Sequence, residues 1–286
     1  MYKNLDNWNT YEGFAYGSGT STQEWVIEKS TGTIGLFKKR KDTDVTDNIS
    51  EKLASDIASI IGIQCAKIDL ATRRGDIGLI SYKINSDIEI LEEGINYISK
   101  IYPCYNRDTL IDEDSNEKYS LEIILKSIEG LGLEKDLFKI FIFDCIIGNS
   151  DRHHSNWATL RNDKGIRICP IYDNASSLCS YIKDDQIKKY FNDRNWFNAQ
   201  VDSKSKSLIR INGKKVRHSD FVRYLKQNYY FETIDFIYKI KERFTNEVVI
   251  NLMNGYNKVL SEYKIKMLKD YLICKKDIIL DIYNIK

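Results

Sequence analysis

Alternating apolar and polar positions dominate the first part of the chain. The stretch 25–41 (WVIEKSTGTIGLFKKRK) predicts two β-strands, because apolar residues alternate on both sides of the turn-forming triplet STG. Apolar residues then recur at helical spacing over 50–61, and a glycine follows that ends the pattern. Residues 63–84 return to strand-like alternation around a second turn. Residues 1–84 are therefore expected to form a β-rich unit that carries one helix.

Helical spacing is more common in the rest of the chain. The predicted elements are helices over 119–131 and 135–147, a loop-rich stretch over 148–217 with a hairpin at 207–216, and helices from 219 onward. This change of pattern predicts a boundary near 84/85, with a small lobe of residues 1–84 and a larger, mostly helical lobe of residues 85–286. The expected fold class is α+β.

Charge and cysteine content narrow the class of protein. The 286 residues carry 43 Lys and Arg against 41 Asp and Glu, which excludes a surface that is basic throughout and gives no reason to expect direct nucleic-acid binding. The most apolar stretch, 137–148, contains two charged residues and is too short to span a bilayer. Six cysteines occur without a C-x-x-C pair, and the first 17 residues contain no apolar core of signal-peptide length. We expect a reduced, cytoplasmic protein without membrane contact.

A basic run over 204–218 surrounds the predicted hairpin. We interpret it as a solvated hairpin whose lysines give solubility, because no aromatic residue interleaves the charges as in single-strand nucleic-acid sites. The alternative interpretation is a docking site for an acidic substrate or a nucleic acid.

The chemistry-bearing segment is FDCIIGNSDRHHSNWATL, followed by IRICPIYDNASSL. Asp151 and Asn156 have the D-x-x-x-x-N spacing of a kinase catalytic loop, in which the Asp orients the attacking hydroxyl and the Asn ligates Mg²⁺. Asp173 follows an apolar run, at the position where a kinase needs a second side chain to bind Mg²⁺. The same spacing occurs twice more, at Asp144/Asn149 and Asp193/Asn198. Only the middle pair has a helix before it and a strand ending in an acid after it.

The segments IIGNSDRHHSNWATL and PIYDNASSL resemble the signature of the HipA-like serine/threonine kinases. This resemblance implies a two-lobed protein-kinase-like fold that uses ATP and Mg²⁺. It also implies that Asp151 is the catalytic aspartate, that His153 is the histidine of the catalytic loop, and that Asn156 and Asp173 bind the metal. Phosphoinositide-kinase-like enzymes share the string D-R-H-x-x-N, but PIYDNASSL favours the HipA-like family.

A kinase also needs a cation for the nucleotide phosphates, held by a glutamate from a helix. In TIGLFKKRK, strand alternation places Lys38 on the same face as Leu36, a candidate adenine contact, and turns Lys39 to solvent. Lys38 is therefore the preferred residue. Its expected partner is Glu51, although an acid in the first turn of a helix is also favoured by the helix dipole alone.

The segment AYGSGTSTQEW is the candidate phosphate-covering loop, because its glycines permit close backbone approach. The residues expected to contact phosphate are Gly17, Ser18, Gly19 and Thr20. The segment is similar to one that is autophosphorylated in HipA-like kinases, which points to Ser18 first and Ser21 second. It departs from the family at Trp25, where a lysine is usual. The adenine edge is expected to meet the main chain at Ser81 and Tyr82, in the strand that leads to the larger lobe.

The leading hypothesis is an ATP- and Mg²⁺-dependent serine/threonine protein kinase that acts on a protein substrate and autophosphorylates its phosphate loop. By resemblance, it is the toxin of a toxin–antitoxin pair. Because larger family members carry an additional N-terminal subdomain, a small antitoxin protein is expected to supply the missing part. The alternatives are a lipid or small-molecule kinase that uses the same site, and a nucleotide-binding pseudokinase that acts as a partner protein.

Overall fold

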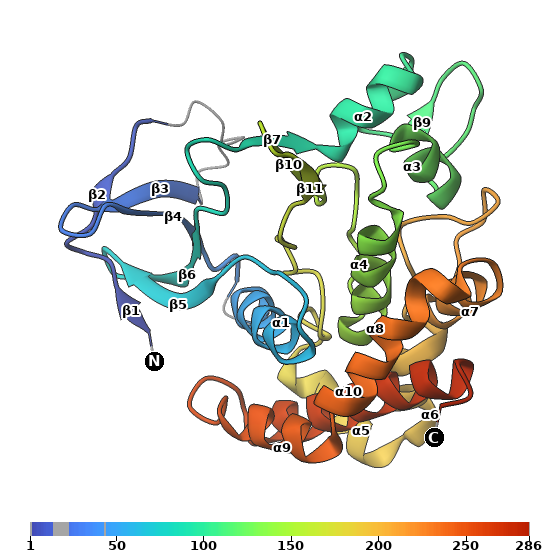
Figure 1. Ribbon diagram of the computed structural model, residues 1–286. Helices are drawn as coiled ribbons and strands as arrows, with labels where there is room; N and C mark the ends of the chain where they lie inside the picture. The colour runs from blue at the N-terminus through green and yellow to red at the C-terminus, as the bar shows by residue number, and fades with distance from the viewer. Residues whose placement is uncertain (1, 14–22, 43, 286) are drawn as a thin grey trace.

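The chain folds into two lobes, which a computed structural model describes for residues 2–13, 23–42 and 44–285 (Figure 1). In its described residues the smaller lobe contains a twisted sheet and one helix, and the larger lobe contains most of the helices. This is the expected α+β architecture. The last strand of the main sheet ends at Tyr82, and the boundary at 84/85 stays a prediction.

Six strands form the sheet of the small lobe, in the order β1-β5-β6-β4-β3-β2. Neighbouring strands are antiparallel except β1 and β5, which are parallel. The strands are β1 Lys3–Asn4, β2 Asn9–Thr10, β3 Gln23–Glu28, β4 Thr33–Lys39, β5 Ile68–Arg73 and β6 Asp76–Tyr82. The β3–β4 and β5–β6 pairs confirm the strands predicted around the two turns.

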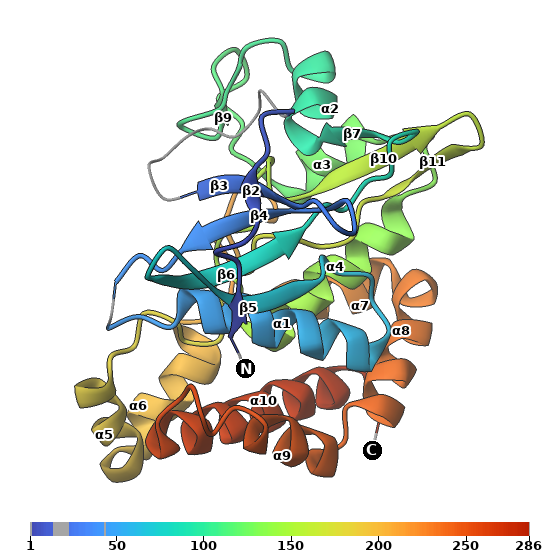
Figure 2. The ribbon, with the colours of Figure 1, turned by 90° about the vertical axis from the view of Figure 1, so that its left-hand side faces the viewer.

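Both faces of this sheet are covered, but by different parts of the chain. On one face, Trp8 and Phe37 belong to a small buried cluster with Leu5, Val26, Ala71 and Ile80. Helix α1, Asp47–Ile61, contacts β5 and β6 on the side that faces the helical lobe (Figure 2). Its buried residues recur at helical spacing from Ile49 to Ile61, and Gly62, with φ of 77°, ends it as the sequence predicts.

The larger lobe is built around α4, whose apolar residues are buried on every side by α7, α8 and α10 (Figure 1). Its helices are α2 Gly94–Ile101, α3 Leu121–Ser127, α4 Glu134–Ile147, α5 Asp184–Asn192, α6 Arg194–Asn198, the π-helical turn η1 Ala199–Ser203, α7 His218–Asn228, α8 Tyr230–Arg243, α9 Asn246–Asn254 and α10 Glu262–Ile282. Its strands are β7 Ile90–Glu93, β8 Tyr105–Asn106, β9 Ile111–Asp112, β10 Ala158–Asn162 and β11 Gly165–Ile168. No helix in the described parts of the chain is both long enough and apolar enough to cross a bilayer.

Two expectations for the larger lobe need correction. The stretch 148–217 is less rich in loops than expected, because α5, α6 and η1 lie within it. Helix α5 buries only Ile187 and Tyr190, which is too few apolar positions to give a helical pattern in the sequence. The predicted hairpin keeps its Asn212-Gly213 turn, with φ of 48° and 70°, but the ladder is reduced to isolated bridges. One reason is that Arg210 bridges to Ser120 instead of extending the hairpin.

Candidate active site

The loop that contains Asp151 begins where α4 ends, and a close contact requires glycine there. Gly148 has φ of 65°, and a Cβ at this position would lie 2.0 Å from the hydroxyl oxygen of Tyr271. The next residue, Asn149, donates its side-chain amide to Asp144 and accepts the N–H of Asp151 at its Oδ1 at 3.1 Å. These contacts fix the direction in which the chain enters the loop.

The loop closes on itself around Asp151. The main-chain carbonyl of Asp151 accepts the side-chain amide of Asn156 at 2.7 Å and the N–H of His153 at 2.9 Å. The His153 ring accepts the N–H of Ser155 at Nδ1, 3.2 Å away. No described residue donates to Oδ1 of Asn156, so this oxygen is free to bind a ligand. The carboxylate of Asp151 is half-buried at the mouth of the loop.

The buried guanidinium of Arg152 joins this loop to the segment that carries Asp173. Its Nε and Nη2 bind the two carboxylate oxygens of Asp144 at 3.0 and 2.7 Å. The remaining N–H groups reach the carbonyls of Asn156 and Tyr172, at 2.7 and 2.9 Å, and the side-chain oxygen of Asn174, at 2.6 Å. All five donors of the guanidinium are therefore used. One buried side chain positions the residues on both sides of Asp173.

A second buried chain of hydrogen bonds supports the same loop from the C-terminal helices. Lys275 donates to the hydroxyl of Ser205 at 2.6 Å, and that hydroxyl lies 2.9 Å from Nδ1 of His218. The Asn149 carbonyl can only accept, so Nε2 of His218 carries the hydrogen that binds it at 2.8 Å. In the neutral ring Nδ1 is then the acceptor of the Ser205 proton. Burial, with Lys275 nearby, lowers the pKa of His218 to about 3, which keeps this ring neutral.

The cation of the small lobe lies across the cleft from these loops. Lys38 Nζ is 3.1 Å from Oε1 of Glu51 and 3.3 Å from Oδ1 of Asp173. Strand β4, helix α1 and the segment after Ile171 are thereby joined by one ammonium group. Asp173 has φ of 55°, a left-handed conformation that Asp adopts more readily than most residues. Lys39 points away and pairs with Asp76 at 2.6 Å.

The charges of the cluster perturb one another. Burial opposes the charge of Lys38, but Glu51 and Asp173 outweigh it and raise the pKa of this lysine. Burial also disfavours the charged form of Asp173, yet the Lys38 ammonium holds its pKa below the usual value. For Asp151, burial raises the pKa against the opposing charge of His153, and the Asp173 carboxylate raises it further. Asp173 therefore stays an anion while Asp151 is the better proton acceptor of the two.

A small cavity of about 110 Å³ opens beside Lys38, Glu51 and Asp173. Asn48, from the first turn of α1, lines it, is 4% exposed, and finds no hydrogen-bond partner for either side-chain atom among the described residues. A buried amide without a partner is costly unless a ligand or water satisfies it. Asn48 is therefore a candidate ligand-binding residue at the edge of the cluster.

The donor set fits a hard cation. Asp173 offers a carboxylate that is 43% exposed, and Asn156 offers an amide oxygen, the ligand types that Mg²⁺ takes alongside water and phosphate. In the described parts of the chain, no three His, Cys, Asp or Glu side chains converge into a site that would hold a metal by themselves. The protein thus supplies a partial shell, which a bound phosphate group would complete.

The predicted phosphate-loop and adenine-binding residues are not tested by the structure. The phosphate-loop residues Gly17, Ser18, Gly19, Thr20 and Ser21 lie outside the described part of the chain. Ser81 and Tyr82 end the central strand β6, where the N–H of Tyr82 already donates to the Lys67 carbonyl at 3.0 Å. The main-chain role of these two residues toward adenine stays a prediction.

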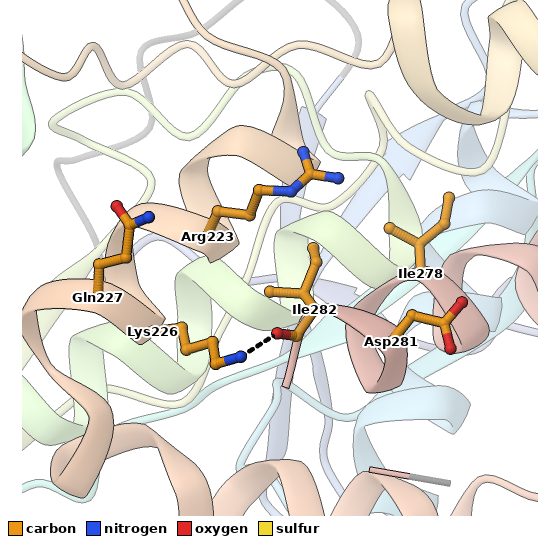
Figure 3. Close-up of a pocket in the computed structure, with 6 residues that line it drawn as sticks. All are labelled: Arg223, Lys226, Gln227, Ile278, Asp281 and Ile282. Atoms are coloured by element: carbon orange, nitrogen blue, oxygen red, sulfur yellow. Dashed lines mark hydrogen bonds between the residues drawn. The ribbon is translucent and has the colours of Figure 1, made fainter. Parts of the chain in front are cut away.

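A larger hollow lies far from this cluster, between α7 and α10 (Figure 3). Its volume is about 520 Å³, and it is lined by Arg223, Lys226, Gln227, Ile278, Asp281 and Ile282. Lys226 crosses it to the Ile282 carbonyl at 2.5 Å. None of the residues that bind or surround Lys38 or Asp151 lines it, so it is not part of the site.

Four contributing residues were not expected from the sequence. Arg152 and Asp144 are 8 positions apart and meet only because α4 and the loop fold back on each other. His218 reaches the loop from 69 residues away, and no local pattern indicates such a contact. Asn48 had one available signal, a polar residue on the buried side of an amphipathic helix close to Glu51.

Comparison with known proteins finds a matching family and a related kinase. The HipA-like C-terminal domain family matches residues 14–218. The serine/threonine-protein kinase CtkA of Helicobacter pylori is 27% identical over 186 residues, covering 62% of this chain and 56% of that relative. The match therefore spans little more than half the length of that relative.

Two solved structures share the fold. The crystal structure of the Helicobacter pylori proinflammatory kinase CtkA superposes with a TM-score of 0.82 at 18% identity, covering 99% of this chain and 97% of that one. HipA of Shewanella oneidensis, solved with HipB and operator DNA, gives a TM-score of 0.52 at 14% identity, covering 98% of this chain and 63% of that one. At these identities the likeness establishes the two-lobed kinase fold.

Proposed function

Because the chain belongs to the family of HipA-like C-terminal domains, we propose that it is an ATP-dependent kinase that phosphorylates serine or threonine hydroxyl groups of proteins. The observation that carries this proposal is the position of Lys38, 3.1 Å from Glu51 and 3.3 Å from Asp173. A phosphate-binding lysine fixed by a helix glutamate, beside a metal-binding aspartate, is the arrangement that phosphoryl transfer needs.

In this proposal Asp151 binds and orients the acceptor hydroxyl. Its raised pKa, caused mainly by burial, makes the carboxylate a better acceptor for the hydroxyl proton as the oxygen attacks the γ-phosphorus. The new P–O bond forms as the bond to the ADP oxygen breaks. Arg152 and His218 hold the loop in place without touching the reacting atoms.

Nucleotide and metal would use the opposite side of the site. Lys38, held by Glu51, would bind the phosphates, and Asn156 with Asp173 would hold Mg²⁺, which neutralises phosphate charge when bound. The loop with Gly17, Ser18, Gly19 and Thr20 would cover the phosphates. We propose Ser18 first and Ser21 second as its autophosphorylation sites, on the resemblance of this segment to the autophosphorylated segment of HipA-like kinases. A phosphate dianion there would repel nucleotide and so inactivate the kinase.

Family membership also supports a biological role. We propose that the kinase acts in the cytoplasm as the toxin of a toxin–antitoxin pair, with a small antitoxin protein as its partner. The HipA relative was solved in such a complex with HipB. Growth arrest on induced expression, relieved by Asp151→Asn, is the expected result, and arrest that persists in this variant would contradict the proposal.

The test of the activity is transfer of ³²P from ATP, with Mg²⁺, to the protein itself and to a mixed Ser/Thr peptide library. Asp151→Asn should lower the rate by about 100-fold or more while thermal unfolding stays close to wild type. Asp163→Asn, an exposed acid in the β10–β11 turn, is the matched control and should leave transfer unchanged. Wild-type rates in Asp151→Asn would reject the proposed function.

A further inference from the structure

A groove of about 190 Å³ begins beside the catalytic loop. Ser150, the residue before Asp151, lines it together with Ser176, Ser177, residues 179–182, Lys204 and Lys206. The groove therefore starts one residue from the carboxylate that is proposed to orient the acceptor hydroxyl. A chain segment that presents a hydroxyl to Asp151 would have neighbouring residues within reach of this groove.

The groove is cationic. Lys204 and Lys206 are exposed, and none of the described residues that line the groove is acidic. The nearest acid along the chain, Asp202, is already bound by Arg217 at 2.7 Å and by the Ser219 hydroxyl. Neither lysine has an ion-pair partner within the described ranges. Two unneutralised ammonium groups among the lining residues favour an anionic ligand.

A buried hydroxyl among the lining residues gives a second, independent indication. Ser180 lines the groove and is 2% exposed, yet its Oγ has no hydrogen-bond partner among the described residues. Its carbonyl accepts the N–H of Thr46, just before α1, which fixes the backbone at this point. A buried hydroxyl without a partner is costly in a native structure unless a ligand or water binds it.

The wall that carries Ser180 is held in one conformation. Leu178 and Cys179 both have left-handed backbones, with φ of 52° and 53°, and Leu178 donates its N–H to the Ile147 carbonyl at 2.7 Å. The buried ammonium of Lys264 binds the carbonyls of Cys179 and Ile182 at 2.6 and 3.1 Å. Strain of this kind persists only where surrounding contacts impose it, and it is common at functional sites. The groove is thus preformed for its ligand.

We propose that this groove selects protein substrates in which a carboxylate or phosphate group lies within a few residues of the acceptor serine or threonine. The anionic side chain binds Lys204 and Lys206, and the Ser180 hydroxyl donates a hydrogen bond to it. This inference rests on the proposed kinase activity and assigns its substrate class. It replaces the interpretation of these two lysines as a solvated surface, whereas Lys214 and Lys215 at the Asn212-Gly213 turn remain solvated.

The test is a peptide library with one Ser or Thr acceptor, in which each flanking position carries Asp, phosphoserine, Ala or Lys in turn. Wild-type enzyme should phosphorylate the Asp or phosphoserine peptides at least several-fold faster than the Ala peptides, and Lys peptides slowest. Lys204→Glu with Lys206→Glu should reduce this selection by about three- to tenfold or reverse it, since each exposed pair contributes modestly. A phosphoserine preference over Asp identifies phosphate as the ligand, and equal rates identify simple negative charge.

Lys214→Glu with Lys215→Glu is the matched control, because it makes the same change in net charge at the exposed turn and should keep the wild-type selection. Asp151-dependent transfer without selection for anionic residues would overturn this inference and leave the proposed function standing. Wild-type selection in the variant Lys204→Glu with Lys206→Glu would overturn it in the same way. Absence of transfer to every peptide and to the protein itself would instead reject the proposed function, and this inference with it.

Discussion

Replacing Arg152 by methionine should test how the two loops of the site are held together. Arg152 is 1% exposed and its partner Asp144 is 4% exposed, so Arg152→Met leaves a buried carboxylate without its cation. Breaking a buried ion pair in this way costs about 3–5 kcal/mol of folding free energy. The same change removes the donors to the carbonyls of Asn156 and Tyr172, which flank the reacting groups.

Stability and activity should separate in the double variant Asp144→Leu with Arg152→Met. Exchanging a buried ion pair for apolar side chains of similar volume is often neutral, so the double variant should recover about 2–4 kcal/mol relative to the sum of the single changes. Phosphate transfer should not return, because no side chain then binds the carbonyls of Asn156 and Tyr172.

Urea unfolding of the wild type, both single variants and the double variant gives the coupling free energy, and ³²P transfer gives the activity. The matched control is Arg217 with Asp220, an Arg–Asp fork with N···O distances of 2.7 and 2.9 Å whose side chains are 40% and 37% exposed. Its coupling should stay below about 1 kcal/mol. Single effects at Arg152 and Asp144 that add within about 0.5 kcal/mol, or a double variant with wild-type activity, would refute the reasoning.

Two further predictions concern buried polar groups. Asn48→Leu should raise the Tm, because an unpartnered buried amide costs about 1–3 kcal/mol, and should also raise the KM for ATP; an unchanged KM would contradict a nucleotide contact. Burial lowers the pKa of His218 to about 3. Below about pH 6.5 the histidine of the unfolded chain therefore binds a proton that the folded chain excludes. The free energy of unfolding should fall by up to about 1.4 kcal/mol for each pH unit of acidification. His218→Asn should make the free energy of unfolding depend less steeply on pH between pH 7 and 5. Burial lowers the pKa of His154 to about 4, so His154 contributes equally to the pH dependence of the wild type and the variant. Equal slopes would show that His218 is not the group responsible.

Local pattern was a good guide wherever the structure is local. The turn between β3 and β4 and the helix that ends at Gly62 follow from alternation, helical spacing and one glycine. The D-x-x-x-x-N spacing pointed to Asp151 and Asn156 for the same reason, because both belong to a single loop.

The remaining parts depend on contacts that no short segment encodes. The four residues that Arg152 binds lie on α4, on its own loop and on the segment around Asp173, which come together only in the folded lobe. Helix α5 was taken for loop because its two buried residues leave most of its surface polar. The basic run was judged by composition, which could not separate Lys204 and Lys206, on the groove, from Arg217, which is paired with Asp202 and Asp220.

Helix α10 supports the Asp151 loop, although the ribosome synthesises this helix after the loop. Its Tyr271 packs on Gly148, its Lys275 begins the chain of hydrogen bonds to Asn149, and its Lys264 holds the wall that contains Ser180. The ribosome makes these side chains long after it makes the loop they support, and at about 5–20 residues per second the delay is several seconds. A nascent chain that extends beyond Asp173 but not into α10 therefore carries Lys38, Asp151 and Asp173, which are proposed to act in the reaction, without the framework that aligns them. The loop reaches its final conformation only when α10 docks on it. Synthesis of the catalytic-loop residues and formation of the ordered site are therefore separate events in time.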